Sequence, residues 1–100
     1  MHRILLQWIC THQAELEKKG VMTDEIFCTD ESVPMPCARV DQSTDTCIGR
    51  ICVWKNGMID IEVLGIQNEE RKMIAHYEAQ TQLDCFLQPY IKVMLDKNDA

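Results

Sequence analysis

The chain has 100 residues and carries 16 acidic against 10 basic side chains, which gives a formal net charge of −6 at pH 7. This length supports one domain with a single core, and we treat residues 1–100 as that domain. The acidity argues against nucleic acid as a partner, because nucleic-acid affinity is built from clustered lysine and arginine. It favours instead a partner protein with a basic surface.

No apolar run in the sequence approaches the roughly 20 residues of a membrane-spanning helix. The apolar start, Ile4–Ile9, is interrupted by Gln7, and no small-residue cleavage site follows it. We therefore expect a cytoplasmic protein with no membrane partner. In that reducing compartment we expect the six cysteines to stay thiols, although an even number would suggest three disulfides in a secreted chain.

The first predicted element is an amphipathic helix over residues 4–19. Its apolar residues recur at three- and four-residue spacing, and Gly20 can adopt the left-handed conformation that closes a helix. Residues 26–28 are predicted to form a short strand, after which Pro34 and Pro36 favour a loop. Alternation over residues 37–41 predicts the next strand, which pairs with the segment that follows it.

The strongest local signal is Asn56-Gly57 between two alternating runs rich in β-branched residues, which predicts a hairpin. With these two residues as the loop, Trp54 pairs with Ile59. One face is then expected to meet the helices: Ile48, Arg50, Cys52, Trp54, Ile59, Ile61 and Val63. The opposite, partly solvated face carries Ile51, Val53, Met58, Asp60, Glu62 and Leu64. A shift of one residue would exchange the two faces.

Arg50 is out of place on an apolar face. Three arrangements would accommodate it: a position at the edge of the face with the charge in water, a carboxylate partner, or a bulge at Gly49 that turns it away. The sequence does not choose among them.

The rest of the chain predicts one more strand and a second helix. Residues 72–79 alternate, and apolar residues keep helical spacing from Leu83 to Met94. Pro89 must kink this helix or mark the first turn of a new segment that starts near Gln88. We therefore predict an α+β domain, with an antiparallel sheet of four to five strands packed by an N-terminal and a C-terminal helix.

The sequence contains no phosphate-binding glycine loop, nucleophile elbow or zinc-protease helix. Cys47 and Cys52 would point to opposite faces of one strand, which does not suit a shared metal ion. We expect no catalytic residue, cofactor or metal. A small ligand-binding domain, or an enzyme using His12, His76 or a thiol, is the rival interpretation, and an oligomeric structural subunit is a third.

Two acidic regions are candidate partner-binding surfaces. The first is the segment over residues 21–45, which is opposed by Arg39 alone and contributes Asp24, Glu25, Asp30 and Glu31. The second is the solvated face of the hairpin, where an apolar centre has an acidic rim: Ile51, Val53, Met58, Asp60 and Glu62. We favour the hairpin face, because a strand positions its side chains more rigidly than a loop does.

Several segments resemble immunity proteins of the TriTu family. They are Ser32–Pro36, Ala38–Asp41, Ile48–Arg50 with Trp54, Asp60–Leu64 and Glu69–Glu70. The two flanking helices come in the expected order, so the likeness covers nearly the whole chain. The resemblance implies a cytoplasmic, non-enzymatic antidote. Such a protein would bind the ADP-ribosyltransferase domain of a toxin that acts on elongation factor Tu, and would keep NAD or that target out of the toxin's active site.

Overall fold

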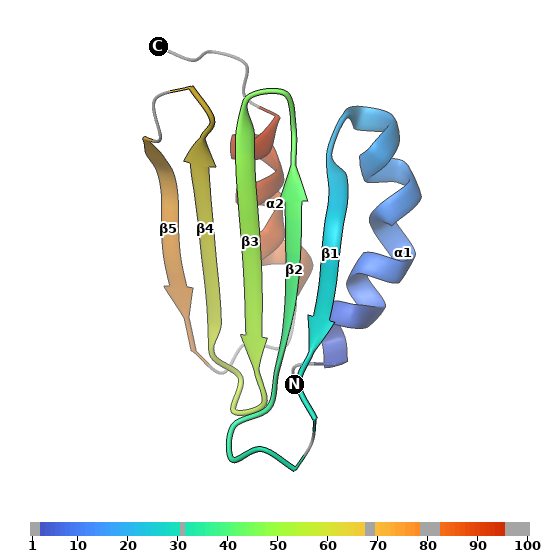
Figure 1. The fold of residues 1–100 in the computed structure, drawn as a ribbon, viewed down its shortest axis with the longest axis vertical. Coiled ribbons are helices and arrows are strands. Elements are labelled where there is room, and N and C mark those ends of the chain that lie inside the picture. The colour runs from blue at the N-terminus through green and yellow to red at the C-terminus, as the bar shows by residue number, and fades with distance from the viewer. Residues whose placement is uncertain (1–2, 31, 68–69, 79–82, 96–100) are drawn as a thin grey trace.

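The computed structural model describes residues 3–30, 32–67, 70–78 and 83–95, and it confirms the predicted α+β domain. Its elements are α1 (Arg3–Lys19), β1 (Met22–Cys28), β2 (Cys37–Ser43), β3 (Cys47–Trp54), β4 (Ile59–Gly65), β5 (Arg71–Tyr77) and α2 (Leu83–Met94). The strands form one five-stranded antiparallel sheet in the order β1-β2-β3-β4-β5 (Figure 1). Each strand therefore pairs with its neighbours in sequence.

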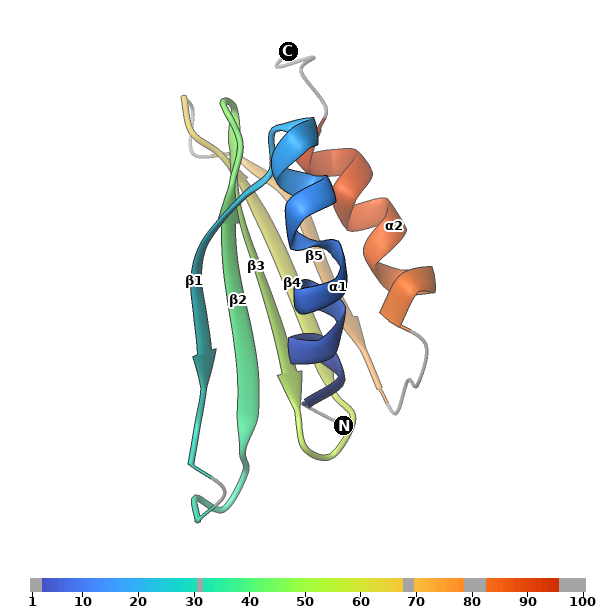
Figure 2. The same cartoon turned by 90° about the vertical axis from the view of Figure 1, so that its right-hand side faces the viewer.

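Both helices lie on the same face of the sheet, which we call the inner face (Figure 2). α1 packs on β1 and β2, whereas α2 packs on β3, β4 and β5, and the two helices touch each other. The core fills the space between the helices and the inner face. Its buried side chains include Leu5, Trp8, Ile9 and Leu16 from α1 and Leu87, Tyr90 and Met94 from α2. No helix of the described residues covers the opposite, outer face.

The helices follow the sequence pattern closely. Gly20 closes α1 in the left-handed region at φ 103°, as predicted, and Val21 donates its N–H to the Leu16 carbonyl at 2.9 Å. α2 continues through Pro89, so the alternative of a separate segment starting near Gln88 is wrong. The first strand is longer than the predicted residues 26–28, because it begins at Met22.

The turn of the central hairpin differs from the prediction. Gly57 donates its N–H to the Trp54 carbonyl at 2.9 Å, and Trp54 donates its own N–H to the Met58 carbonyl at 2.8 Å. Residues 55–57 therefore form a three-residue loop, and Gly57 occupies the left-handed region at φ 94°. Such loops typically combine a type I turn with a glycine in this conformation. The third loop residue moves the pairing of β3 and β4 by one position.

The changed register exchanges the two faces of β3 and leaves those of β4 as predicted. The inner face carries Ile51, Val53, Ile59, Ile61 and Val63, and the outer face carries Ile48, Arg50, Cys52, Trp54, Asp60, Glu62 and Leu64. Ile51 and Val53 are fully buried, so their predicted place on a solvated face is wrong. Asp60 and Glu62 are exposed, as predicted.

Gly49 is a packing site and not a bulge. The pairing of β3 with β2 and with β4 is continuous through Gly49, and a Cβ atom there would come within 2.5 Å of Tyr90 Oη and 2.7 Å of Met94 Sδ. The predicted alternative of a bulge is therefore wrong. Arg50 lies on the outer face with a carboxylate partner, since its Nε donates to Asp41 Oδ1 at 2.8 Å.

Two hydrogen bonds between polar side chains link α2 to β2 and β1 in the interior. Tyr90 Oη donates to Gln42 Oε1 at 2.7 Å, and Gln42 Nε2 donates to Thr23 Oγ1 at 3.1 Å. Burial raises the pKa of Tyr90, so its hydroxyl keeps the proton that it donates. The side chains of Tyr90 and Gln42 are fully buried, and burying their polar groups without hydrogen-bond partners would cost free energy. These hydrogen bonds remove that cost.

Candidate partner-binding surface

The outer face presents its side chains in rows that cross the sheet from β1 to β5. One row contains Glu25, Asp41, Arg50, Glu62 and Ile74, and the next contains Phe27, Arg39, Cys52, Asp60 and His76. Phe27, Ile48 and Ile74 are 40%, 51% and 61% exposed. This face thus carries exposed apolar side chains among charged ones, a mixture that is also found in protein–protein interfaces.

On the β1–β2 half of the outer face, arginine side chains form ion pairs with the neighbouring carboxylates. Arg39 lies 3.4 Å from Glu25 and 3.5 Å from Asp41, and its guanidinium stacks over the Phe27 ring at 4.9 Å. Arg50 binds Asp41 through two nitrogens, at 2.8 and 3.4 Å. The carboxylates of this half are therefore already engaged by arginine.

The acidic segment over residues 21–45 is more ordered than the predicted loop. Asp24 and Glu25 belong to the edge strand β1, at the irregularity between Thr23 and Glu25. Asp30 lies in the β1–β2 connection and accepts the Ser32 N–H at 3.0 Å. Glu31 lies outside the described residues. The partner-binding role of these acids stays a prediction, as does that of Met58, which is half-buried beside the hairpin turn.

Asp60 is the centre of a hydrogen-bonded network on the β4–β5 half. Trp54 Nε1 donates to Asp60 Oδ2 at 3.1 Å, and His76 Nδ1 donates to Asp60 Oδ1 at 2.6 Å. The hydrogen bond with His76 lowers the pKa of Asp60, and the bond from Trp54 adds to this effect. The Asp60 carboxylate is thus held ionised and in a fixed orientation between β3 and β5.

Beside this network lies a shallow hollow of about 330 Å³, whose lining includes Arg50, Cys52, Asp60, Glu62, Ile74 and His76. We call it the outer hollow. Ile74 was not predicted as a site residue, although the alternation of residues 72–79 placed it with His76 on one side of a strand. The missing information was that this strand pairs with β4, directly beside Glu62.

The rival enzyme interpretation gains no support from the described residues. His12 donates from Nδ1 to its own helix carbonyl, that of Trp8, at 2.9 Å, and its ring stacks on the Trp8 indole. Burial and the neighbouring Cys37 thiol raise the pKa of Cys52 to about 12, so this thiol stays protonated and is a poor nucleophile. His76 lies across Asp60 from Cys52, which is the wrong order for a base beside a nucleophile.

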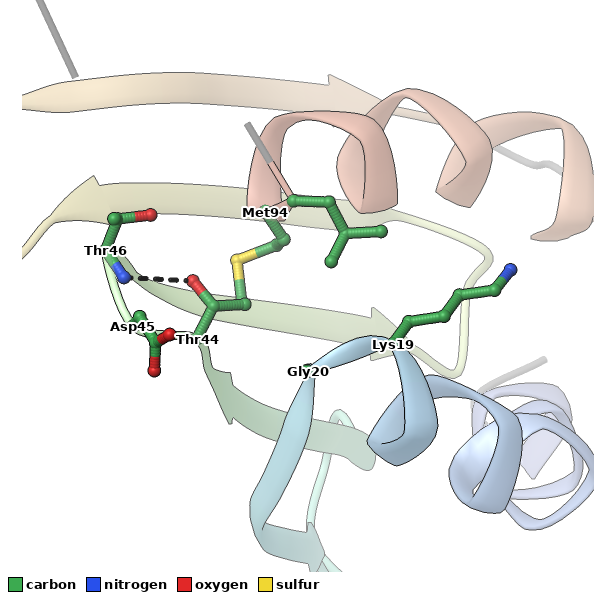
Figure 3. Close-up of a pocket in the computed structure, with 7 residues that line it drawn as sticks. Lys19, Gly20, Thr44, Asp45, Thr46 and Met94 are labelled. Atoms are coloured by element: carbon green, nitrogen blue, oxygen red, sulfur yellow. Dashed lines mark hydrogen bonds between the residues drawn. The ribbon is translucent and has the colours of Figure 1, made fainter. Parts of the chain in front are cut away.

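The described part of the chain holds no group of three or more histidine, cysteine, aspartate or glutamate side chains placed to bind a metal ion. A second pocket lies where the ends of both helices meet the β2–β3 turn (Figure 3), and Thr44, Thr46 and Met94 line it. Its volume of about 40 Å³ has room for only a few water molecules, which is too small for a substrate.

A titration of His76 would test the Asp60 network. The hydrogen bond to Asp60 raises the pKa of His76 above its ordinary value of 6.5, with a smaller contribution from Glu78. The stabilising effect of this pair is therefore present at pH below 6.5 and is lost as the pH rises through the folded-state pKa. We expect an NMR titration of the His76 ring to have its midpoint above 6.5, and Asp60→Asn to lower that midpoint. An unchanged midpoint in Asp60→Asn would show that the hydrogen bond does not form in solution.

The domain therefore has one sheet face covered by both helices and one open face of mixed charged and apolar side chains. The family model described as Immunity protein TriTu matches residues 3–93. The chain therefore belongs to the TriTu immunity protein family, which confirms the resemblance. No curated protein matches the chain. Family membership makes it an immunity protein, whose partner is a toxin, and indicates a non-enzymatic role. No helix among the described residues is long and apolar enough to cross a membrane.

Proposed function

We propose that this immunity protein neutralises a cognate ADP-ribosyltransferase toxin that modifies elongation factor Tu. It acts in the cytoplasm by binding the toxin's transferase domain. The bound antidote covers either the NAD pocket or the surface that receives elongation factor Tu. Neither route requires chemistry by the antidote itself.

The observation that supports this proposal most is the uncovered outer face. Five paired strands hold its backbone in place, so the binding of a partner does not have to order the backbone first. Phe27, Ile48 and Ile74 offer apolar anchors, and the arginines and carboxylates around them offer charge-assisted hydrogen bonds. The net charge of −6 would also speed encounter with a basic partner.

The outer hollow does not suit the rival role of a small-molecule site. Ligand pockets usually bury most of the surface of the ligand, between walls lined by apolar groups. The walls here are the side chains of Arg50, Asp60 and His76, which are 58%, 52% and 44% exposed. A broad protein surface fits such a shallow and polar hollow better than a small molecule does.

The test uses the cognate transferase domain, which we would seek in the coding sequence beside that of this protein. We expect the two purified proteins to form a stable complex in size-exclusion chromatography, and the complex to stop transfer of labelled ADP-ribose from NAD to elongation factor Tu. The antidote alone should not consume NAD. An ADP-ribosyltransferase from an unrelated toxin is the control, and it should stay active in the presence of this protein.

Two results would contradict the proposal. One is the absence of any complex with the cognate domain at micromolar concentrations. The other is protection of elongation factor Tu without binding to the toxin, for example through removal of ADP-ribose from the modified target, which would make the protein an enzyme.

A further inference from the structure

The outer hollow combines an exposed apolar side chain of β5 with two carboxylates of the neighbouring strand β4. Ile74 is 61% exposed, the largest fraction among the exposed apolar side chains of the described chain. Glu62 lies directly opposite it on β4, and the next pair along the two strands is Asp60 with His76. Ile74 thus adjoins the Glu62 carboxylate on the neighbouring strand, and the Asp60 carboxylate beside it is held by Trp54 and His76.

The charge of the hollow is more negative than its lining suggests. Arg50 is the arginine at its edge, but Asp41 from β2 holds the Arg50 guanidinium through two hydrogen bonds. Asp41 is also the main cause of the raised pKa of Arg50, while Glu62 adds only a weaker charge interaction. Glu62 is exposed and lies between Arg50 and Ile74 in the row across the sheet.

Other exposed surfaces are less suited to a basic partner. Glu25 and Asp41, on the β1–β2 half of the outer face, are already paired with Arg39. A groove along α2, lined in part by Pro89 and Ile91, has Lys92 as its charged side chain, which would repel a cation. In the outer hollow, by contrast, an exposed apolar side chain adjoins a carboxylate, that of Glu62, which no arginine among the described residues holds through a hydrogen bond.

We propose that the outer hollow is the docking site for the toxin and receives an arginine or lysine side chain of the transferase domain. The aliphatic stem of that side chain packs on Ile74, and its cationic end binds the Glu62 carboxylate, with Asp60 as a second acceptor. Long basic side chains commonly bury their stems on apolar surface and keep the charge at a polar edge. This inference rests on the proposed function, because it names the surface and the chemistry through which the antidote binds.

The test compares two variants of the hollow with two matched controls elsewhere. Glu62→Lys reverses the charge and leaves the bonds of Asp60 to Trp54 and His76 in place. Ile74→Ala removes the apolar floor. The controls are Glu15→Lys on α1, where Glu15 is exposed, and Ile26→Ala on β1, where Ile26 is 46% exposed and faces the helix side of the sheet. Circular dichroism and urea denaturation would establish that all four variants are folded.

We expect surface plasmon resonance to separate the two contributions to binding. Glu62→Lys should slow association and raise the Kd roughly tenfold or more at low salt, and its effect should shrink as ionic strength rises, because salt screens exposed charges. Ile74→Ala should act mainly by speeding dissociation. Both controls should stay within about twofold of the wild type, the change expected where a side chain lies outside the interface.

The outcomes distinguish this inference from the proposed function. If the wild-type protein binds and inhibits the toxin but Glu62→Lys and Ile74→Ala behave like the controls, the outer hollow is not the docking site. If the wild type itself does not bind, the proposed function fails, and the inference fails with it. A toxin variant in which one arginine or lysine is changed to glutamate, and which binds Glu62→Lys better than it binds the wild type, would identify the inserted side chain.

Discussion

Replacing Ile51 with alanine should lower the free energy of unfolding by about 2–5 kcal/mol, the range measured for truncation of large core side chains. The Ile51 side chain is fully buried on the inner face of the sheet, where the observed register pairs it with Ile61 beneath the helices. Its removal would lose buried apolar contacts and leave a cavity that the surrounding strands cannot close. Urea denaturation with a two-state fit gives the measurement.

Ile48→Ala is the matched control, since Ile48 lies on the same strand and its side chain is 51% exposed on the outer face. It should change stability by no more than about 0.5 kcal/mol, as is usual for surface substitutions. If Ile48→Ala were the more damaging of the two, β3 would have the register predicted from a two-residue loop, and the described faces of this strand would be exchanged.

Gly49→Ala should also be destabilising. Whereas Ile51→Ala leaves a cavity, this change adds a methyl group for which there is no space. Its Cβ would lie 2.5 Å from Tyr90 Oη, 2.7 Å from Met94 Sδ and 2.9 Å from Tyr90 Cε1. Tyr90 cannot move away easily, since it is fully buried and its hydroxyl is bound to Gln42. Overpacking of this kind costs about 1–3 kcal/mol, which thermal or urea denaturation would detect.

A double-mutant cycle would locate the clash. Tyr90→Phe removes the atom nearest to the new methyl group, at the cost of leaving Gln42 Oε1 without its donor. Gly49→Ala combined with Tyr90→Phe should therefore be more stable than the sum of the two single changes implies. Simple additivity would show that the methyl group does not meet the Tyr90 hydroxyl.

The sequence was sufficient to predict the fold class and the faces of β4, because its alternation allows one solution. Ile59, Ile61 and Val63 are separated by Asp60 and Glu62, so one face is apolar and the other is charged. The exposure of Asp60 and Glu62 followed from that pattern. Their role in binding stays a prediction.

The pattern of β3 could not be resolved in the same way. Ile51 and Val53 on one face are matched by Ile48, Cys52 and Trp54 on the other, so both faces are apolar enough to be buried. The length of the turn decides between them, and Asn56-Gly57 is compatible with a loop of two residues or of three. Burial of Ile51 and Val53 then follows from the backbone hydrogen bonds at Trp54, which sequence patterns do not reveal.

The position of Ile74 in the hollow depends on which strand β5 pairs with, and no turn motif in the sequence gives that partner. The sequence placed Ile74 and His76 on one side of a strand but did not give the partner of that strand. The meander order puts β5 against β4, and this brings Ile74 to Glu62 and His76 to Asp60. Candidate residues chosen from single segments therefore missed the β5 side of the outer hollow.

The helices cover one face of the sheet and leave the other open, and this arrangement has an evolutionary consequence. Neighbouring residues along β4 have different environments, since every second side chain packs in the core and the side chains between them face outward. Substitutions at the outward positions are usually nearly neutral for stability, whereas they alter charge and shape where a partner would bind. A lineage of such proteins can therefore change its specificity as an opposing toxin changes, one outward residue at a time, while the same folded scaffold persists.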